Sequence, residues 1–193
     1  MSNGLLVLTP LRIEAMAARG SSQVIRTGMG AARSRVAAAQ VAEMPARAVA
    51  VLGFCGALTD DIEPGDVVVA DELRGNGPPL KCEPLQQLLQ SLETVGVRTR
   101  VGPFVSVPKL SLGSERARLA EDGSIAVDME TAWLAPAAAG RPFAALRAVV
   151  DTPSKELVRF STLYGGIKAY RALGRAARAL DSWTRTLPDQ KET

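Results

Sequence analysis

Glu14, Glu130 and Asp151 each stand at or just past the end of a segment rich in aliphatic or β-branched residues. If these segments are strands of one α/β sheet, the three acids lie at the edge where such sheets usually bind their ligands. Two carboxylates that face each other across a sugar can divide the work of breaking a glycosidic bond. The one in apolar surroundings keeps its proton and acts as an acid, while the other stays ionised and activates water. Asp151 follows Val149 and Val150, which predicts the apolar setting for it.

Each acid also has an ordinary structural explanation. Asp128 can be the cap of a helix that begins near Thr131, and Glu130 can be a cap or first-turn acid of the same helix. A single acid of this kind is as often a cap or a surface ion pair as a functional group. Only the joint pattern therefore favours chemistry.

The amino-acid composition argues against several other kinds of catalysis and binding. The 193 residues contain no histidine, and the two cysteines, Cys55 and Cys82, are not in a CxxC spacing. Histidine is the commonest zinc ligand and the commonest general base, so we expect no metal site, no cofactor and no Ser-His or Cys-His catalysis. The 23 basic and 20 acidic residues give a net charge of +3 without a basic cluster, so no nucleic-acid partner is expected.

Alternating strand-like and helix-like segments predict the scaffold that positions the acids. Strands are expected at 5–8, 24–27, 48–52, 67–70, 101–107, 125–127 and 143–150, and helices at 31–41, 84–95, 115–120, 131–139 and 167–183. This order predicts an α/β protein, a three-layer α/β/α sandwich with a central mixed sheet. The length predicts a single domain over residues 1–187 and a disordered tail over 188–193. Without a spanning segment or a signal pattern, the protein is expected to be cytoplasmic.

Two segments after predicted strands are expected to reach the ligand. Phe54, Cys55 and Gly56 lie in a run of mostly small residues, predicted to form a loop, where the backbone can approach a ligand closely. Lys109 and Leu110 lie in the loop after another strand. We expect these five residues to bind substrate. The turn at residues 28–30, of the form GxG, can also present N–H groups to an anion, although this motif is more often only a tight turn.

Taken together, these segments resemble the nucleoside phosphorylase and nucleosidase superfamily from Leu5 to Asp151. Similar proteins carry an apolar strand that leads to an acid, a glycine turn, a small-residue segment with a PGD turn, a VDME-type segment and a strand that ends in Asp. Here the VDME segment is residues 127–130. The resemblance implies that Met129 and Glu130 hold the ribosyl hydroxyls. It also implies that Asp151 protonates purine N7 and that Glu14 is the water-activating base of the hydrolytic branch.

Departures from the family pattern favour water over phosphate as the nucleophile. Phosphorylases of this superfamily hold phosphate with an Arg before the small-residue segment and a Ser inside it, where this chain has Val51 and Phe54. An alternative register would place Arg12, which resembles a phosphate-binding Arg, in the pocket instead of Glu14. Val150 stands where the family usually has a Ser before the terminal Asp, which weakens one expected hydrogen bond to the base.

The chain resembles the branch associated with hopanoid synthesis, which releases adenine from adenosylhopane. The resemblance rests on the short segment between Glu14 and Thr27 together with TPLRIEA, RTGMG, AVDMETAWL and RPFAALRAVVDTP. The resemblance implies a nucleoside substrate with an apolar 5′ group, a homo-oligomer, and peripheral membrane contact if the substrate is a lipid. The residues that could line an apolar exit are Leu110, Leu112, Trp133 and Phe160, although residues of this kind are more often ordinary core. A methylthioadenosine or adenosylhomocysteine nucleosidase, a purine nucleoside phosphorylase and a non-catalytic nucleoside-binding protein remain as alternatives.

Overall fold

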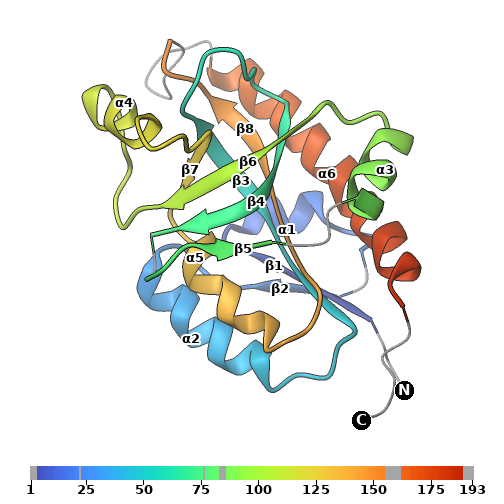
Figure 1. Cartoon of the computed structure of the whole chain (residues 1–193). Helices are drawn as coiled ribbons and strands as arrows, with labels where there is room; N and C mark the ends of the chain where they lie inside the picture. The colour runs from blue at the N-terminus through green and yellow to red at the C-terminus, as the bar shows by residue number, and fades with distance from the viewer. Residues whose placement is uncertain (1–3, 22, 76, 83–85, 155–161, 189–193) are drawn as a thin grey trace.

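A computed structural model describes residues 4–21, 23–75, 77–82, 86–154 and 162–188. Its strands are β1 (Leu5–Thr9), β2 (Gln23–Arg26), β3 (Ala48–Ala57), β4 (Val67–Arg74), β5 (Leu80–Lys81), β6 (Thr99–Ser106), β7 (Ala126–Asp128) and β8 (Phe143–Asp151). In this described part of the chain they form one mixed sheet in the order β2-β1-β3-β7-β6-β4-β5, with β8 paired to both β3 and β4 (Figure 1).

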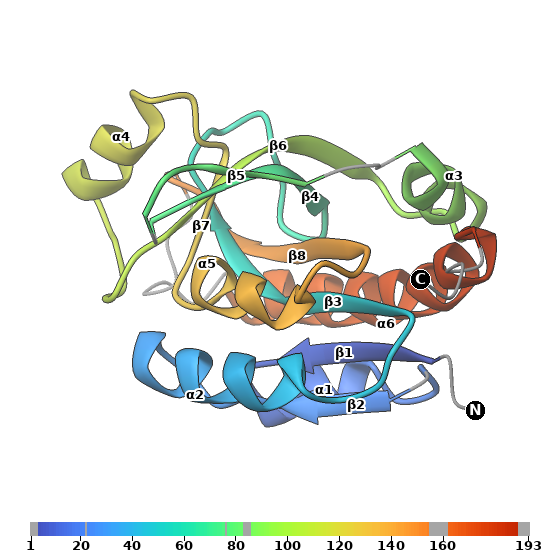
Figure 2. The same cartoon turned by 60° about the horizontal axis from the view of Figure 1, so that its bottom comes forward.

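Helices cover both faces of the sheet. They are α1 (Arg12–Ala17), α2 (Ala31–Ala42), α3 (Gln86–Thr94), α4 (Ser114–Ala120), α5 (Thr131–Leu134), the 3₁₀ helix η1 (Ala135–Ala138) and α6 (Thr162–Thr186). α1, α3 and α6 pack together on one face, whereas α2, α5 and η1 pack on the other (Figure 2). α4 lies apart at one edge. The predicted three-layer α/β/α sandwich with a mixed sheet is therefore confirmed.

Successive side chains of β1 point to opposite faces of the sheet, so this one apolar strand contributes to the core on both faces. Leu5 and Val7 belong to the core shared with α6, while Leu6 and Leu8 belong to the core shared with α2. All four side chains are buried. A strand that is covered on both faces needs this continuous aliphatic run.

β3 continues through residues that were expected to form a loop. Gly53 to Ala57 remain in the strand, and Gly53 to Gly56 pair in parallel with β8. The register shifts between Cys55 and Gly56, so that Gly56 lies opposite Asp151. Irregularities of this kind bend a strand and redirect its side chains. The small residues thus lie next to the predicted acid, but the prediction of a loop was wrong.

The helix predicted over 131–139 is also different in the structure. α5 ends at Leu134 and the chain continues as η1, with Pro136 in the first turn of η1 and Ala139 in the left-handed region at φ 47°. Proline has no N–H to donate to the preceding turn, which disfavours continuation of the α-helix. The acids before α5 are therefore followed by only one α-helical turn.

The acids converge for a different reason from the predicted one, because the strands that carry them do not all run in the same direction. β7 is antiparallel to β3, with Val127 opposite Gly56, and parallel to β6. The carboxyl ends of β7 and β3 therefore meet from opposite directions, rather than lying side by side at one edge of a parallel sheet. This crossing brings Asp128 and Glu130 close to the end of β8.

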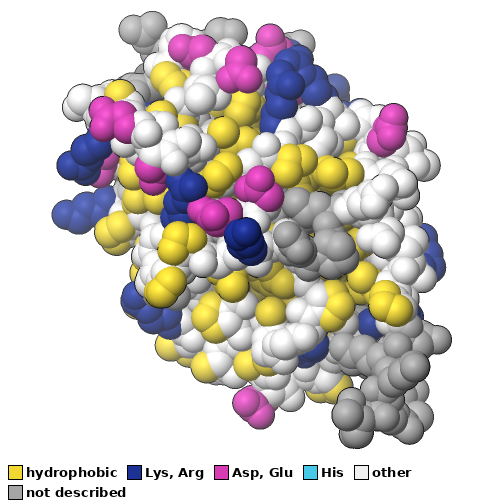
Figure 3. All heavy atoms as spheres, viewed as in Figure 1, with side chains coloured by type: hydrophobic (Ala, Val, Ile, Leu, Met, Phe, Trp, Pro, Cys, Tyr) yellow, Lys and Arg dark blue, Asp and Glu magenta, His cyan; other side chains and the backbone are white. Residues whose placement is uncertain are grey.

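One face of the protein carries basic and acidic side chains interspersed. On the face shown in Figure 3, Lys and Arg side chains lie among acidic ones rather than in one continuous basic patch. In the described part of the chain, none of the helices has the length and apolar character needed to span a membrane. The predicted disordered tail, apart from Pro188, lies outside the described residues.

Candidate active site

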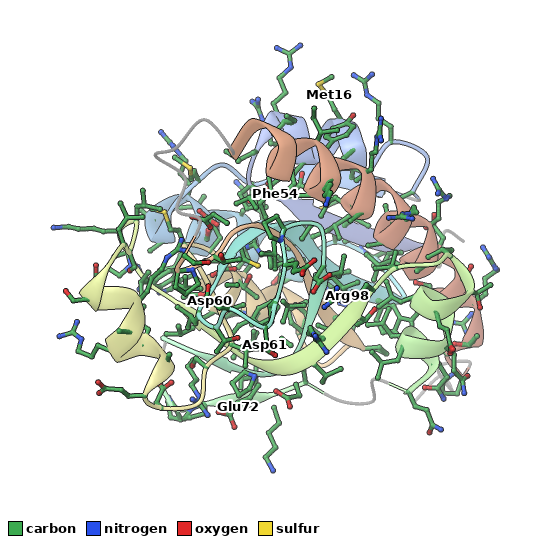
Figure 4. The ribbon with its side chains drawn as sticks, turned by 90° about the horizontal axis from the view of Figure 1, so that it is seen from above. Met16, Phe54, Asp60, Asp61, Glu72 and Arg98 are labelled. Carbon is green, nitrogen blue, oxygen red and sulfur yellow. The ribbon has the colours of Figure 1, made fainter. Side chains whose placement is uncertain are left out.

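One cavity of about 360 Å³ brings the predicted site residues together. All nine of them line it: Glu14, Phe54, Cys55, Gly56, Lys109, Leu110, Met129, Glu130 and Asp151. They come from α1, β3, the segment after β6, the turn after β7 and the end of β8. Seen from above, Phe54 lies in the interior, while Met16 of α1 points away from the body of the protein (Figure 4).

Glu14 is held in the cavity wall by backbone donors. Its carboxylate accepts hydrogen bonds from the N–H of Leu11 at 2.7 Å and from the N–H of Phe54 at 2.7 Å. Burial raises the pKa of Glu14 to about 6, against the opposing effect of Arg147 and of these two N–H groups. A carboxylate with a pKa near neutrality suits a general base. Arg12, the alternative occupant, is exposed and does not line the cavity.

Arg147 is a central residue that sequence reasoning missed. Its side chain is 1% exposed, and its guanidinium lies 2.8 Å from Asp128, 3.7 Å from Glu130 and 3.9 Å from Glu14. Burial alone would lower the pKa of Arg147, but these three carboxylates together raise it. The available signal was a single charged residue inside the otherwise apolar segment FAALRAVV, because a buried charge requires partners.

Asp128 organises the turn that carries Glu130. It accepts hydrogen bonds from the N–H of Glu130 at 3.2 Å and of Thr131 at 3.2 Å, and from the Ser106 hydroxyl at 2.5 Å. The N-cap position of α5 is Glu130, whose side chain makes no cap hydrogen bond, whereas Asp128 accepts the N–H of Thr131 from two positions before the cap and pairs with Arg147. Ser106 was not singled out from the sequence.

Glu130 connects the turn after β7 to the glycine turn after β2. Its Oε1 accepts a hydrogen bond from the N–H of Gly30 at 3.0 Å. Gly28 and Gly30 have φ values of 82° and 88°, which other residues adopt only with strain. The turn therefore does present an N–H group to an anion, and this anion is the Glu130 carboxylate. Burial raises the pKa of Glu130, while Arg147 opposes the shift.

The setting of Asp151 is buried, as expected, but it is not apolar on every side. Nη2 of Arg116, from α4, lies 2.7 Å from Oδ2 of Asp151, and both side chains are almost fully buried. Nε of Arg116 donates to the carbonyl of Ser111 at 2.9 Å. A Cβ at Gly56 would come within 2.9 Å of Asp151 Oδ1. Gly56 is thus the small residue that leaves room for this ion pair, and Arg116 was not found from the sequence.

The residues suggested to line an apolar exit differ in whether they reach the cavity. Leu110 lines the cavity and is 56% exposed at its mouth. Trp133 is buried, with Arg35 stacked 5.6 Å from the centre of its ring, and Leu112 does not line the cavity. Trp133 is therefore core, as the simpler explanation held. Phe160 lies outside the described residues.

The cavity has two chemically distinct groups of charges. One consists of Glu14, Glu130 and Asp128 around Arg147, and the other is the pair formed by Arg116 and Asp151. In the first group, a carboxylate with a raised pKa lies beside a second carboxylate that can accept hydrogen bonds from hydroxyl groups. Among the described residues, no group of three or more His, Cys, Asp or Glu side chains could hold a metal ion.

Comparisons with known proteins agree with this architecture. S-adenosylhomocysteine nucleosidase from Streptococcus pyogenes superposes with a TM-score of 0.78 at 20% identity, over 97% of this chain and 99% of that chain. Methylthioadenosine/S-adenosylhomocysteine nucleosidase from Campylobacter jejuni superposes with a TM-score of 0.80 at 15% identity, over 93% of this chain and 99% of that chain. Futalosine hydrolase from Helicobacter pylori superposes with a TM-score of 0.74 at 15% identity, over 95% of this chain and 97% of that chain.

At these identities, the superpositions establish a shared fold. A search of curated protein sequences finds no match. The family model described as the phosphorylase superfamily matches residues 15–178, which is most of the 193-residue chain. The chain therefore belongs to the phosphorylase superfamily.

Proposed function

We propose that this protein is a purine nucleosidase that hydrolyses the N-glycosidic bond of a 5′-modified adenosine and releases adenine. The observation that carries the proposal is the placement of Glu14, a buried carboxylate with a pKa of about 6, in the same cavity as Asp151. Glu14 takes a proton from the attacking water. Met129 and Glu130 hold the sugar, and Asp151 serves the departing base.

The charges of the cavity favour water over phosphate as the nucleophile. An anion near Glu14 is repelled, and two unit charges about 4 Å apart at an effective dielectric near 20 cost roughly 4 kcal/mol. Arg147, the nearest buried cation, is already shared among three carboxylates. Lys109 also lines the cavity but is exposed at its mouth, and Phe54 offers no charge.

The cavity mouth supports an apolar 5′ substituent. Met29 and Leu110 both line the cavity and are 50% and 56% exposed, respectively. Apolar side chains at an open rim favour an apolar ligand group over water. We include adenosylhopane among the proposed substrates on this ground, together with peripheral membrane contact during its uptake. Methylthioadenosine and adenosylhomocysteine, whose nucleosidases share the fold, are the second candidates.

A panel of nucleosides tests the function. Adenine release should be measured from adenosine, methylthioadenosine, adenosylhomocysteine and an adenosine with a long 5′-alkyl chain. We expect release from at least one of the 5′-modified compounds and the highest kcat/KM for the alkyl compound. Calorimetric binding of adenine without turnover of any compound would instead identify a nucleoside-binding protein.

Replacing Glu130 with Ala should weaken both substrate binding and rate. The carboxylate is placed to accept hydrogen bonds from ribosyl hydroxyls, which position the sugar and support positive charge on its ring. The wild-type protein should therefore prefer a ribonucleoside to its 2′-deoxy counterpart, and Glu130→Ala should lose this preference. Glu72→Ala, which removes a carboxylate paired with Arg74 outside the cavity, is the matched control. Equal treatment of both sugars by the wild type would remove this role from Glu130.

We also propose that the protein forms a homo-oligomer. Large apolar side chains are exposed on α1 and α6, which pack together: Ile13 at 50%, Met16 at 39% and Ile167 at 47%. Exposed apolar side chains on adjoining elements are typical of subunit interfaces. Sedimentation velocity at micromolar concentration should give a dimer or larger species, and a monomer would count against the proposal.

A further inference from the structure

Helix α6 carries a stripe of basic side chains that the proposed reaction does not use. Four of its basic residues are spaced by three or four positions, which places them on one side of the helix: Lys168, Arg171, Arg175 and Arg178. The sequence of α6 contains a single acid, Asp181, which lines a different hollow together with Arg47. Seen from above, α6 runs along one side of the molecule (Figure 4).

The basic stripe lines a groove of about 710 Å³. Another wall of this groove is the turn of residues 63–66, which contributes Glu63 and Asp66. Arg98 lies 3.6 Å from Glu63 and 3.3 Å from Asp66, so these two acids already have a cation of their own. The four basic and two acidic side chains of the lining leave the groove with a positive formal charge.

Three members of the stripe have charge to offer to an external partner. The guanidinium groups of Arg171, Arg175 and Arg178 form no ion pair with any of the described residues. Nε of Arg175 is covered and has no hydrogen-bond partner among these residues. A solvated helix face usually mixes acids with bases at spacings of three or four, whereas this one does not. Its charge is complementary to an anionic surface.

The stripe begins beside the active-site cavity. Gly166 of α6 lines that cavity and precedes Lys168 by two residues, about 3 Å along the helix axis. Met29 and Leu110, which line the same cavity, are half exposed. A surface that binds the stripe therefore lies close to a cavity with an apolar rim.

We propose that the basic stripe of α6 docks the protein on an anionic phospholipid membrane, so that a substrate with an apolar 5′ group enters the cavity from the bilayer. Clusters of Lys and Arg on a helix are attracted to anionic lipid headgroups. A nucleic acid would meet the same charges, but it is no source of an apolar ligand. The delivery of substrate rests on the proposed function and deepens it, whereas the docking itself needs no hydrolysis.

The docking surface is distinct from the proposed subunit interface. Ile13, Met16 and Ile167, the exposed apolar side chains assigned to that interface, do not line the groove beside the stripe.

Vesicle binding tests the docking without any need for turnover. The 193-residue protein should be sedimented with vesicles of phosphatidylcholine alone and of phosphatidylcholine mixed with phosphatidylglycerol. We expect binding to the anionic vesicles only, and weaker binding as the salt concentration rises. Equal binding to both kinds of vesicle, or to neither, overturns the proposal.

Neutralising the stripe should release the protein from anionic vesicles. Each basic residue near such a surface contributes about fivefold to affinity, so the combined substitutions Arg171→Gln, Arg175→Gln and Arg178→Gln should weaken binding about a hundredfold. If the half-buried Arg175 is needed for folding, the two exposed substitutions, Arg171→Gln and Arg178→Gln, should still weaken binding about 25-fold.

A variant with the same loss of charge elsewhere is the matched control. Arg26→Gln, Lys81→Gln and Arg118→Gln together remove three exposed basic residues from β2, β5 and α4. This variant should keep most of the wild-type affinity for anionic vesicles. A similar loss in both triple variants would assign the binding to net charge rather than to the stripe and overturn the proposal. Stripe-dependent binding to duplex DNA that is tighter than binding to vesicles would also overturn it.

Adenine release separates the docking from the proposed function. With a water-soluble 5′-modified adenosine, the stripe variant should match wild type, because none of its three arginines lines the active-site cavity. With a long-chain 5′-alkyl adenosine dissolved in anionic vesicles, the stripe variant should be slower than wild type, and equal rates would overturn the delivery of substrate. Vesicle binding as expected, without turnover of any adenosine, would remove the proposed function and leave the docking surface standing.

Discussion

Asp151→Asn is expected to lower the rate of adenine release by about 10²–10⁴-fold. An amide can neither give a proton to the departing base nor balance the Arg116 guanidinium 2.7 Å away. The single-turnover rate of adenine release from a turned-over adenosine measures the loss. Full activity in the variant would remove Asp151 from the reaction.

The same substitution should also destabilise the fold, because Asp151 forms a buried ion pair with Arg116. Removing one partner of a buried ion pair leaves the other charge uncompensated and typically costs about 3–5 kcal/mol. Urea denaturation should therefore accompany the kinetics, so that activity is compared only among folded molecules. Asp122→Asn, which breaks an exposed ion pair with Arg74, is the control and should change the unfolding free energy by less than about 1 kcal/mol.

Glu14→Gln is expected to reduce hydrolysis by a similar factor, about 10²–10⁴-fold, with little change in affinity for adenine. The amide nearly preserves the volume of the side chain and can still accept a hydrogen bond from the Phe54 N–H, but it cannot take a proton from water. Adenine affinity and kcat should therefore separate in this variant. A parallel loss of both would indicate that Glu14 shapes the cavity rather than activating water.

The pH dependence gives a second measurement of Glu14. Below its pKa of about 6 the carboxyl is protonated and cannot act as a base, so wild-type kcat/KM should fall as the pH drops through 6. In Glu14→Gln this acid limb should be absent from the residual activity. An identical limb in the variant would assign it to another group.

The sequence predicted the layers and the residues that meet in one cavity, because both depend on local patterns. Aliphatic runs followed by acids marked β1 and β8, and the residues around VDME marked the turn that carries Glu130. The prediction failed where long-range pairing decides structure. β3 extends through Phe54, since β8 pairs with it from Val49 to Gly56, and β7 runs antiparallel to β3.

The two buried arginines show a different limit of the sequence. Arg147 and Arg116 lie 31 positions apart, in a strand and in a short helix, and each was taken as part of an ordinary element. Their importance comes from the carboxylates that face them, which belong to other segments. A charge inside an apolar strand shows that partners exist, but only the fold shows which ones.

The identity of the sugar product tests the central claim of hydrolysis most directly. The protein should be incubated with a turned-over adenine nucleoside in phosphate-free and in phosphate-rich buffer, and the sugar should be identified by mass spectrometry. Free sugar in both buffers, at equal rates, is the expected result, because Glu14 occupies the place where a phosphate anion would need a cation. Sugar 1-phosphate formed in the phosphate-rich buffer would contradict the account and identify the protein as a phosphorylase.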